Sequence, residues 1–192
     1  MAIPTEELQS LTNKSIIELF TLTLIPSLHG SSNVTRFHSG VGMNSNASII
    51  WQANTYDRFP IEATGFEYSG SGTLPRPTVS VANILVTITA LMATVNATTP
   101  FNDLQGAKFV RIRTLSRFLD ATNFPSNVNP FGTPDDTAEL PQEIYFVNRK
   151  TVENRNVVQF ELISALDLQS IRAPKRQVTT KDFPSVGTFV NA

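Results

Sequence analysis

The fold of this chain is most restricted by two neighbouring segments, residues 143–150 and 155–166, in which apolar and polar side chains alternate. Successive side chains of a β-strand point to opposite faces of a sheet, so a period of two indicates a strand with one buried face. The intervening VENRN supplies a turn. The pair is therefore predicted to form an antiparallel hairpin. The side chains expected on its buried face are Phe146, Val158, Phe160 and Leu162.

Similar alternation recurs along most of the chain, between loops rich in Gly, Pro, Ser and Asn. It predicts further strands at residues 15–25, 34–40, 47–56, 66–74, 78–82 and 107–118. After Asn83 the spacing changes, because apolar residues recur at helical intervals, namely Ile84, Leu85, Ile88, Leu91 and Met92. A second, short helix is predicted after Pro4. We therefore expect a mainly β fold (β-rich α+β), with antiparallel barrel or sandwich domains and one or two helices.

The overall composition excludes several functional classes. The 192 residues carry a net charge of −1, whereas nucleic-acid-binding domains are usually strongly basic. The absence of cysteine excludes disulfides, thiolate metal sites and cysteine nucleophiles. The N-terminus lacks the pattern of a secretion signal. The longest apolar stretch, Val79 to Val95, is too short and too polar to span a bilayer. We expect a protein that is made in the cytoplasm and has no membrane contact.

No group of residues predicts an enzyme. His29 and His38 accompany no nucleophile motif such as GxSxG, and His29, which precedes Gly30, is interpreted as a solvated turn residue. Asp135 and Asp136 lie among Pro and Thr and are interpreted as part of a solvated loop, because HExxH and EF-hand patterns are absent. Paired carboxylates of a glycosidase meet in space, so spacing alone does not test for them. We expect no catalytic, metal-binding or cofactor-binding residues.

The most suggestive charge pattern is formed by Arg111, Arg113 and Arg117. In a regular strand these odd-numbered positions share one face. Such a face can pair with carboxylates across the sheet, for which Glu143 and Glu161 are candidates, or can contact another subunit. It can also bind DNA phosphates, although interleaved aromatic residues are missing. We favour charge pairing or a subunit contact.

Four segments, taken in order, resemble the minor tail protein L family of lambda-like phages. They are IIWQANTYDRFPIEATGF (49–66), GFEYSGSGTLPRPTVSVAN (65–83), DLQGAKFVRIRTLSRFLDATNF (103–124) and EIYFVNRKTVENRNVVQFELISALDLQSIRAPKRQ (143–177). The resemblance implies a structural virion protein, made in the host cytoplasm, at the distal end of the tail. It further implies β domains of tail-tube type that form a ring, a trimer in this family.

The resemblance also implies the partners of that ring. It would join the tail tube or distal tail ring to the central tip protein that contacts the host, and would enclose the channel through which DNA passes transiently. The family normally continues into a C-terminal domain whose cysteines bind an iron–sulfur cluster. Because this sequence has no cysteine, the cluster is not carried over and no cofactor is expected. We expect either a short branch of the family or a cluster domain on another polypeptide.

Two further expectations concern organisation and an anchor. Residues 1–177 are expected to form the β-rich hub region, as two small β subdomains sharing a core, and residues 178–192 an extended C-terminal arm. The loop 125–141 is a second segment expected to gain order on contact with neighbours. Asp120, in the family motif before ATNFP, is expected to anchor a strand end by accepting hydrogen bonds from backbone or from Arg117.

Two other classes of protein compete with the structural subunit. A receptor- or carbohydrate-binding β module would expose aromatic side chains, and the candidates are Trp51, Tyr56 and Tyr68. A cell-wall hydrolase carried by the tail would need a cleft with convergent carboxylates or a histidine-bound metal. Neither class has a motif of its own in this sequence.

Overall fold

The chain is mainly β, as predicted. A computed structural model describes residues 15–40, 48–68, 70, 74–83, 87–167, 178–181 and 183–185, together with residues 4, 5 and 9. The described strands are β1 (Ile16–Thr23), β2 (Val34–His38), β3 (Ile49–Trp51), β4 (Asn54–Arg58), β5 (Ile61–Thr64), β6 (Thr78–Ala82), β7 (Lys108–Leu115), β8 (Glu143–Glu153) and β9 (Val157–Ile163). The described α-helices are α2 (Pro26–His29) and α3 (Thr87–Thr98).

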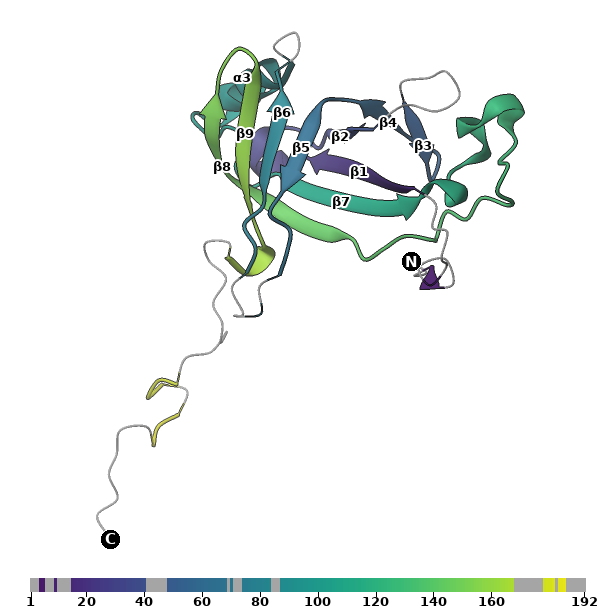
Figure 1. The fold of residues 1–192 in the computed structure, drawn as a ribbon. Coiled ribbons are helices and arrows are strands. Elements are labelled where there is room, and N and C mark those ends of the chain that lie inside the picture. The colour runs from purple at the N-terminus through teal and green to yellow at the C-terminus, as the bar shows by residue number, and fades with distance from the viewer. Residues whose placement is uncertain are drawn as a thin grey trace.

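All nine strands belong to one sheet with the order β3-β4-β2-β1-β7-β8-β9-β6-β5. Every pairing is antiparallel except that of β2 with β4, which is parallel. The sheet curls strongly (Figure 1), because β4 and β5, near its opposite ends, are joined only by Phe59 and Pro60. This link bonds to both sides, since Phe59 N donates to His38 O and Ala82 N donates to Pro60 O, each at 2.9 Å. The curled sheet therefore has a barrel-like interior.

Strands β1 and β7 are covered on both faces by apolar residues. On the concave face, Phe20 and Phe109 belong to the larger core, which fills the curl of the sheet. On the convex face, Leu19 and Ile112 belong to a second core with Trp51 of β3. The prediction of a half-buried strand at residues 15–25 was therefore wrong in its middle, because the chain folds the β3–β4 hairpin over the face expected to be solvated.

The predicted strand at 47–56 is a hairpin of two strands. Gln52 and Ala53 lie between β3 and β4 with φ of 52° and 58°. Two consecutive residues with positive φ form the tight turn whose twist suits a two-residue hairpin, although the usual Asn-Gly signal is absent here. The strand expected at 66–74 is replaced by β5, which begins at Ile61 and ends before Gly65. Part of the glycine-rich stretch, including residues 69 and 71–73, lies outside the described residues.

The predicted hairpin at the end of the sheet is formed by β8 and β9. Val158, Phe160 and Leu162 are buried, as predicted for β9. On β8 the predicted face was wrong, because Tyr145 and Val147 are buried while Phe146 is only half-buried. Register explains the difference. Tyr145 lies opposite the core residue Phe109 of β7, and directly opposed residues share a face.

The structure tests the remaining predicted segments only in part. Helix α3 is confirmed, with Met92 and Val95 buried, but residues 84–86 at its expected start lie outside the described residues. Most of the predicted N-terminal helix and of the arm 178–192 also lies outside them. No helix in the described part of the chain is long and apolar enough to span a membrane.

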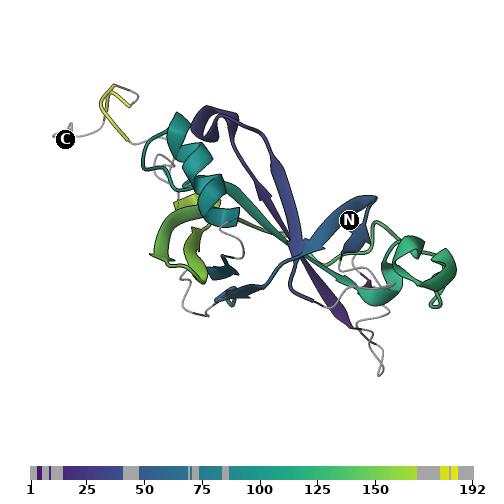
Figure 2. The same cartoon turned by 90° about the horizontal axis from the view of Figure 1, so that it is seen from above.

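Loop 125–141 packs along β7 as part of a lobe at the far end of the molecule from α3 (Figure 2). Thr114 Oγ1 donates to Ala138 O at 2.7 Å, and Leu140 N donates to Arg113 O at 2.8 Å. Asn129 is buried and donates to the carbonyl of Leu119. The loop is thus fixed to its own domain, contrary to the expectation of a free arm.

Candidate functional site

The concave face of the sheet changes from apolar to charged along β7. Arg111 lies opposite Glu143 of β8 and Arg113 lies opposite Glu18 of β1. Arg111 Nη1 donates to Glu143 Oε2 at 3.0 Å, Arg113 Nη2 donates to Glu143 Oε1 at 2.8 Å, and Arg111 Nη2 donates to Glu18 Oε1. We call these four residues the charged cluster. Because it contains two guanidinium groups and two carboxylates, it is neutral as a unit.

An aromatic ring covers the Arg111 end of the charged cluster, while the side chains of Arg113 and Glu18 are 30% and 35% exposed. The guanidinium of Arg111 lies 4.5 Å from the ring centroid of Phe66, close enough for a cation–π contact. Phe66 in turn meets Tyr145 edge to face. Burial acts to lower the pKa of Arg111, but its hydrogen bonds to Glu18 and Glu143 outweigh that effect, and the pKa is raised. Arg111 therefore stays protonated, and its hydrogen bonds tie β1, β7 and β8 together.

Arg117 does not join this cluster. Strand β7 ends at Leu115, and Arg117 lies in the following 3₁₀ turn, Ser116–Phe118. Its guanidinium stacks 5.2 Å from the ring centroid of Phe118, and its carbonyl accepts a hydrogen bond from Asn129. The strand periodicity that placed the three arginines on one face therefore stops before the third. A contact of any of them with another subunit stays a prediction.

Asp120 lies beside the β3–β4 hairpin. Its Oδ2 accepts a hydrogen bond from Ala53 N at 3.0 Å, in the tight turn of that hairpin. A bond from Arg117 to Asp120 stays a prediction. The neighbouring Asn123 binds the hairpin more extensively, since its Oδ1 accepts from Ile50 N at 2.7 Å and its Nδ2 donates to Ile50 O at 2.6 Å. The buried amide thus takes the place of a neighbouring strand along β3. Sequence reasoning missed Asn123, whose only signal was its place in the motif DATNF.

The histidines are structural. His29 is buried, not solvated as predicted, because α2 turns its ring under the loop before β7. Its Nδ1 accepts from Ile25 N at 2.8 Å, and its Nε2 lies 3.1 Å from Gln105 O. Together these bonds indicate that the proton is on Nε2. His38 is buried as well. Within the described ranges, no group of three His, Asp or Glu residues is placed to hold a metal ion.

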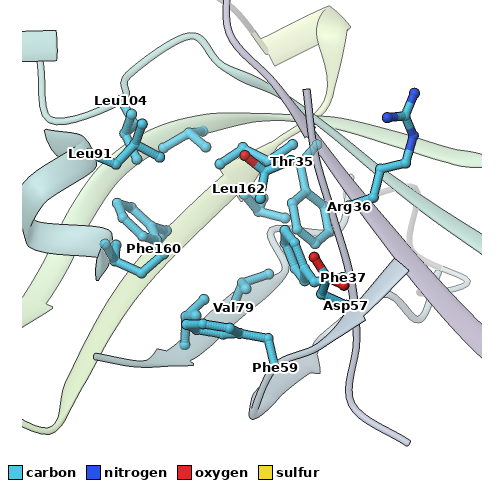
Figure 3. Close-up of a pocket in the computed structure, with 15 residues that line it drawn as sticks. Thr35, Arg36, Phe37, Asp57, Phe59, Val79, Leu91, Leu104, Phe160 and Leu162 are labelled. Carbon is cyan, nitrogen blue, oxygen red and sulfur yellow. The ribbon is translucent and has the colours of Figure 1, made fainter. Parts of the chain in front are cut away.

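A hollow with an apolar lining lies inside the curl of the sheet (Figure 3). It has a volume of about 310 Å³. Phe37, Phe59 and Phe160 surround it from three strands or their ends, and Leu91 and Leu104 cover it from the side of α3. Two carboxylates or a histidine would be needed for hydrolysis, and the lining contains only one carboxylate and no histidine. The cavity is suited to an apolar group, not to acid–base chemistry.

The aromatic residues expected at a carbohydrate-binding surface are mostly inside the protein. Trp51 is fully buried and Tyr56 nearly so, both in the core under the β3–β4 hairpin. Tyr68 is the exception, with 74% of its surface exposed. Burial, with a further contribution from the hydroxyl of Tyr68, raises the pKa of Tyr145 beside it to about 12. One exposed tyrosine does not make a stacking platform for a sugar.

The chain is similar to known phage tail proteins. The model of a protein family described as phage minor tail protein L matches residues 28–185. This span contains β2 through β9 and therefore most of the curled sheet. Tail tip protein L of Escherichia phage lambda is 36% identical over 87 residues, which make up 45% of this chain and 34% of the lambda protein. The match thus spans about a third of the length of that curated relative.

Proposed function

This chain belongs to the phage minor tail protein L family, and on that premise we propose that it is a structural protein of a phage tail tip. The family match over residues 28–185 carries the proposal. The described residues support it, because Arg111 and Arg113 are paired with carboxylates and the lining of the apolar cavity contains only one carboxylate and no histidine. The protein would act by occupying a place in the virion, at the distal end of the tail.

In finer detail, we propose that copies of the chain form a ring, a trimer, that joins the tail tube or distal tail ring to the central tip protein. DNA would pass through the ring only during ejection. A channel wall should not hold DNA by its phosphates. The charged cluster suits such a wall because it has no net charge. Arg111 and Arg113 are paired with Glu18 and Glu143. The net charge of −1 is also compatible with free passage.

The test is genetic complementation. Phage with this gene disabled should fill heads with DNA but form no functional tails, and the wild-type chain supplied in trans should restore them. Electron microscopy of particles gives the readout, and a tag on the supplied chain should label only the distal end of restored tails. Normal tails that adsorb to the host in the complete absence of the protein would refute a structural role.

The same system separates the structural proposal from a receptor-binding module. Tyr68→Ala changes the most exposed of the candidate aromatic residues. Under the structural proposal, this variant restores both tail assembly and adsorption. Tails that assemble normally with the variant but fail to adsorb would favour a receptor- or carbohydrate-binding role instead. Thr55→Ala, an exposed change on β4, serves as the matched control.

A further inference from the structure

Two polar pockets, of about 280 Å³ and 500 Å³, meet at Tyr68 between the segment after β5 and strands β7 and β8. Tyr68, Arg113 and Glu143 line both pockets. We call the two pockets together the Tyr68 groove. We propose that the Tyr68 groove of one copy binds the C-terminal segment around Lys181 of a second copy. The inference deepens the proposed ring and rests on it for its biological setting.

The Tyr68 groove contains buried polar atoms that the chain itself does not pair. Arg113 Nε, Tyr145 Oη and Ser164 Oγ have no hydrogen-bond partner among the described residues, and all three residues line the smaller pocket. The hydroxyl of Tyr68 acts on the pKa of Tyr145, but the two do not meet the geometry of a hydrogen bond. A buried donor without an acceptor costs free energy, so folded proteins pair nearly all of them. A segment with main-chain carbonyl oxygens would satisfy these three donors.

Apolar side chains surround these donors. Leu74 and Ile144 are exposed, and with Pro75 and Pro141 they line the smaller pocket. Apolar walls beside a tyrosine and an arginine are typical of the centre of a protein–protein contact. An apolar hollow of about 150 Å³ already accepts benzene. The smaller pocket therefore has room for the ring of a phenylalanine.

The C-terminal segment offers the matching groups and leaves them uncovered in the single chain. Val178 and Phe183 are 67% and 46% exposed. Phe183 N donates to Thr179 O at 2.8 Å, which closes a turn that contains Lys181. Figure 1 shows the described residues of this segment apart from the sheet of their own chain. A turn that is already closed loses little conformational freedom on binding, and its position favours a groove on another copy.

Charge favours the same contact. Residues 168–192 contain four basic residues and one acidic residue, so they carry a charge of +3 while the rest of the chain carries −4. Within the groove the charged cluster is neutral, and Glu67 in the lining of the larger pocket adds one negative charge. Lys181, two positions before Phe183, has the opposite charge. With Phe183 in the smaller pocket, Lys181 would lie at the larger pocket beside Glu67, and such complementary charges steer association.

The contact joins two different parts of the surface, so each copy can give its C-terminal segment to one neighbour and receive that of another. Contacts of this kind close into rings when the rotation between neighbours permits. One short segment buries far less than the roughly 1,600 Å² of a standard stable interface. The contact therefore strengthens a ring without being required for it, and loss of a single groove side chain leaves assembly intact. Because the free chain is expected to associate weakly, the contact is best captured covalently.

Cysteine cross-linking of full-length chains provides the test, and the absence of native cysteine removes its background. Thr180→Cys, next to Lys181, is mixed with Thr64→Cys, which lines the larger pocket, and the mixture is oxidised. Each chain has one cysteine, so a disulfide can form only between copies. We expect a linked pair that contains one chain of each kind. Thr55→Cys, an exposed position on β4 outside the groove, replaces Thr64→Cys as the matched control and should give little product.

An exchange of charges tests the orientation. Glu67→Lys on the Thr64→Cys chain should lower the yield about tenfold, because two like charges then meet. Adding Lys181→Glu to the other chain should restore the yield, which damage to the fold could not do. Phe183→Ser on the Thr180→Cys chain should lower the yield at least about tenfold, as for a hot-spot residue. All three replaced residues are exposed, and circular dichroism checks that each variant is folded.

The same cysteine pairs are then oxidised in complemented tails. A yield that does not exceed the Thr55→Cys control, or that the exchange of charges does not restore, overturns the inference. Tails that carry the protein at their end but give no cross-link would overturn this contact and leave the proposed function standing. Cross-linking of purified chains that never enter tails would instead refute the proposed function and leave this contact standing.

Discussion

Replacing Glu143 by glutamine tests the charged cluster directly. Glu143 accepts hydrogen bonds from both Arg111 and Arg113, and its side chain is only 15% exposed. The variant keeps the shape of the side chain and one acceptor oxygen but removes the negative charge. Two guanidinium groups then share the single carboxylate of Glu18, and the partly buried cluster carries an unbalanced positive charge.

The magnitude follows from the bonds that are lost. A hydrogen bond between charged groups contributes about 1.5–3 kcal/mol, and one to a neutral acceptor about 0.5–1.5 kcal/mol, so two weakened bonds lose about 2 kcal/mol. The unbalanced charge adds to this, because breaking a buried pair costs about 3–5 kcal/mol in total. Glu18 remains as a partner and is 35% exposed. We therefore expect Glu143→Gln to lower the free energy of unfolding by about 2–4 kcal/mol.

Urea unfolding of the purified chain measures this loss, with Glu161→Gln as the matched control. Glu161 is equally buried at 14% exposure and also pairs with two arginines, Arg149 and Arg76, but these are 69% and 57% exposed. Exposed partners make the pairs weak, so the control should lose less than about 1 kcal/mol. The double variant Glu143→Gln, Arg113→Gln restores charge balance and should recover part of the loss. An equal loss from Glu143→Gln and Glu161→Gln would refute the reasoning.

Four further predictions follow from other contacts. Asn123→Ala should lower the unfolding free energy by about 2–3 kcal/mol, because it leaves partly buried backbone groups of β3 unpaired; an unchanged melting temperature would contradict this. Phe160→Ala should cost about 3 kcal/mol, the low end for a buried ring because Phe160 already borders a cavity, and half-buried Phe146→Ala should cost less in the same assay. Hydrogen bonds from a lysine and an asparagine hold the pKa of Asp103 below 3.8, so its contribution to stability is complete above that pH and is lost as the pH falls through the lower folded-state pKa. Asp103→Asn should therefore flatten the rise of stability with pH in that acid window, which urea unfolding at several pH values would detect. Removal of residues 178–192 should give fragile tails but not abolish assembly, as scored by microscopy of complemented particles.

Much of the strand layout could be predicted from the sequence, because local alternation is enough to mark a strand. β1, β6, β7 and β9 all lie inside segments whose period of two indicated them. Burial was predicted less well. Leu19 and Tyr145 are buried because other elements cover their faces, namely the β3–β4 hairpin and the closed curl of the sheet. Local pattern does not contain that information, nor does it contain the parallel pairing of β2 with β4.

The candidate site, like the fold, could be predicted from the sequence only in part. Sequence named Glu143 and Glu161 as carboxylates for the arginines of β7, and the structure pairs Arg111 and Arg113 with Glu143. Glu161 pairs with other arginines, and Glu18 came from a strand that local pattern did not connect to β7. The cavity could not be predicted, because its lining gathers residues from β1, β2, β4, β6 to β9 and α3. Only the curl of the whole sheet brings them together.

The central place of β1 between β2 and β7 also restricts how the chain can acquire its structure. Glu18 and Arg111 are 93 positions apart in the sequence. Strand β6 can pair with β9 only after β9 has been synthesised. On the ribosome, β1 emerges long before β7, so that the β1–β2, β2–β4, β3–β4 and β5–β6 pairings can form before β1 meets β7. Contacts this distant along a chain close slowly, because the entropy of the intervening loop is lost before the pairing repays it. The nascent protein therefore has strands with unpaired edges until Ile163 has been synthesised. During that interval it is most prone to aggregation.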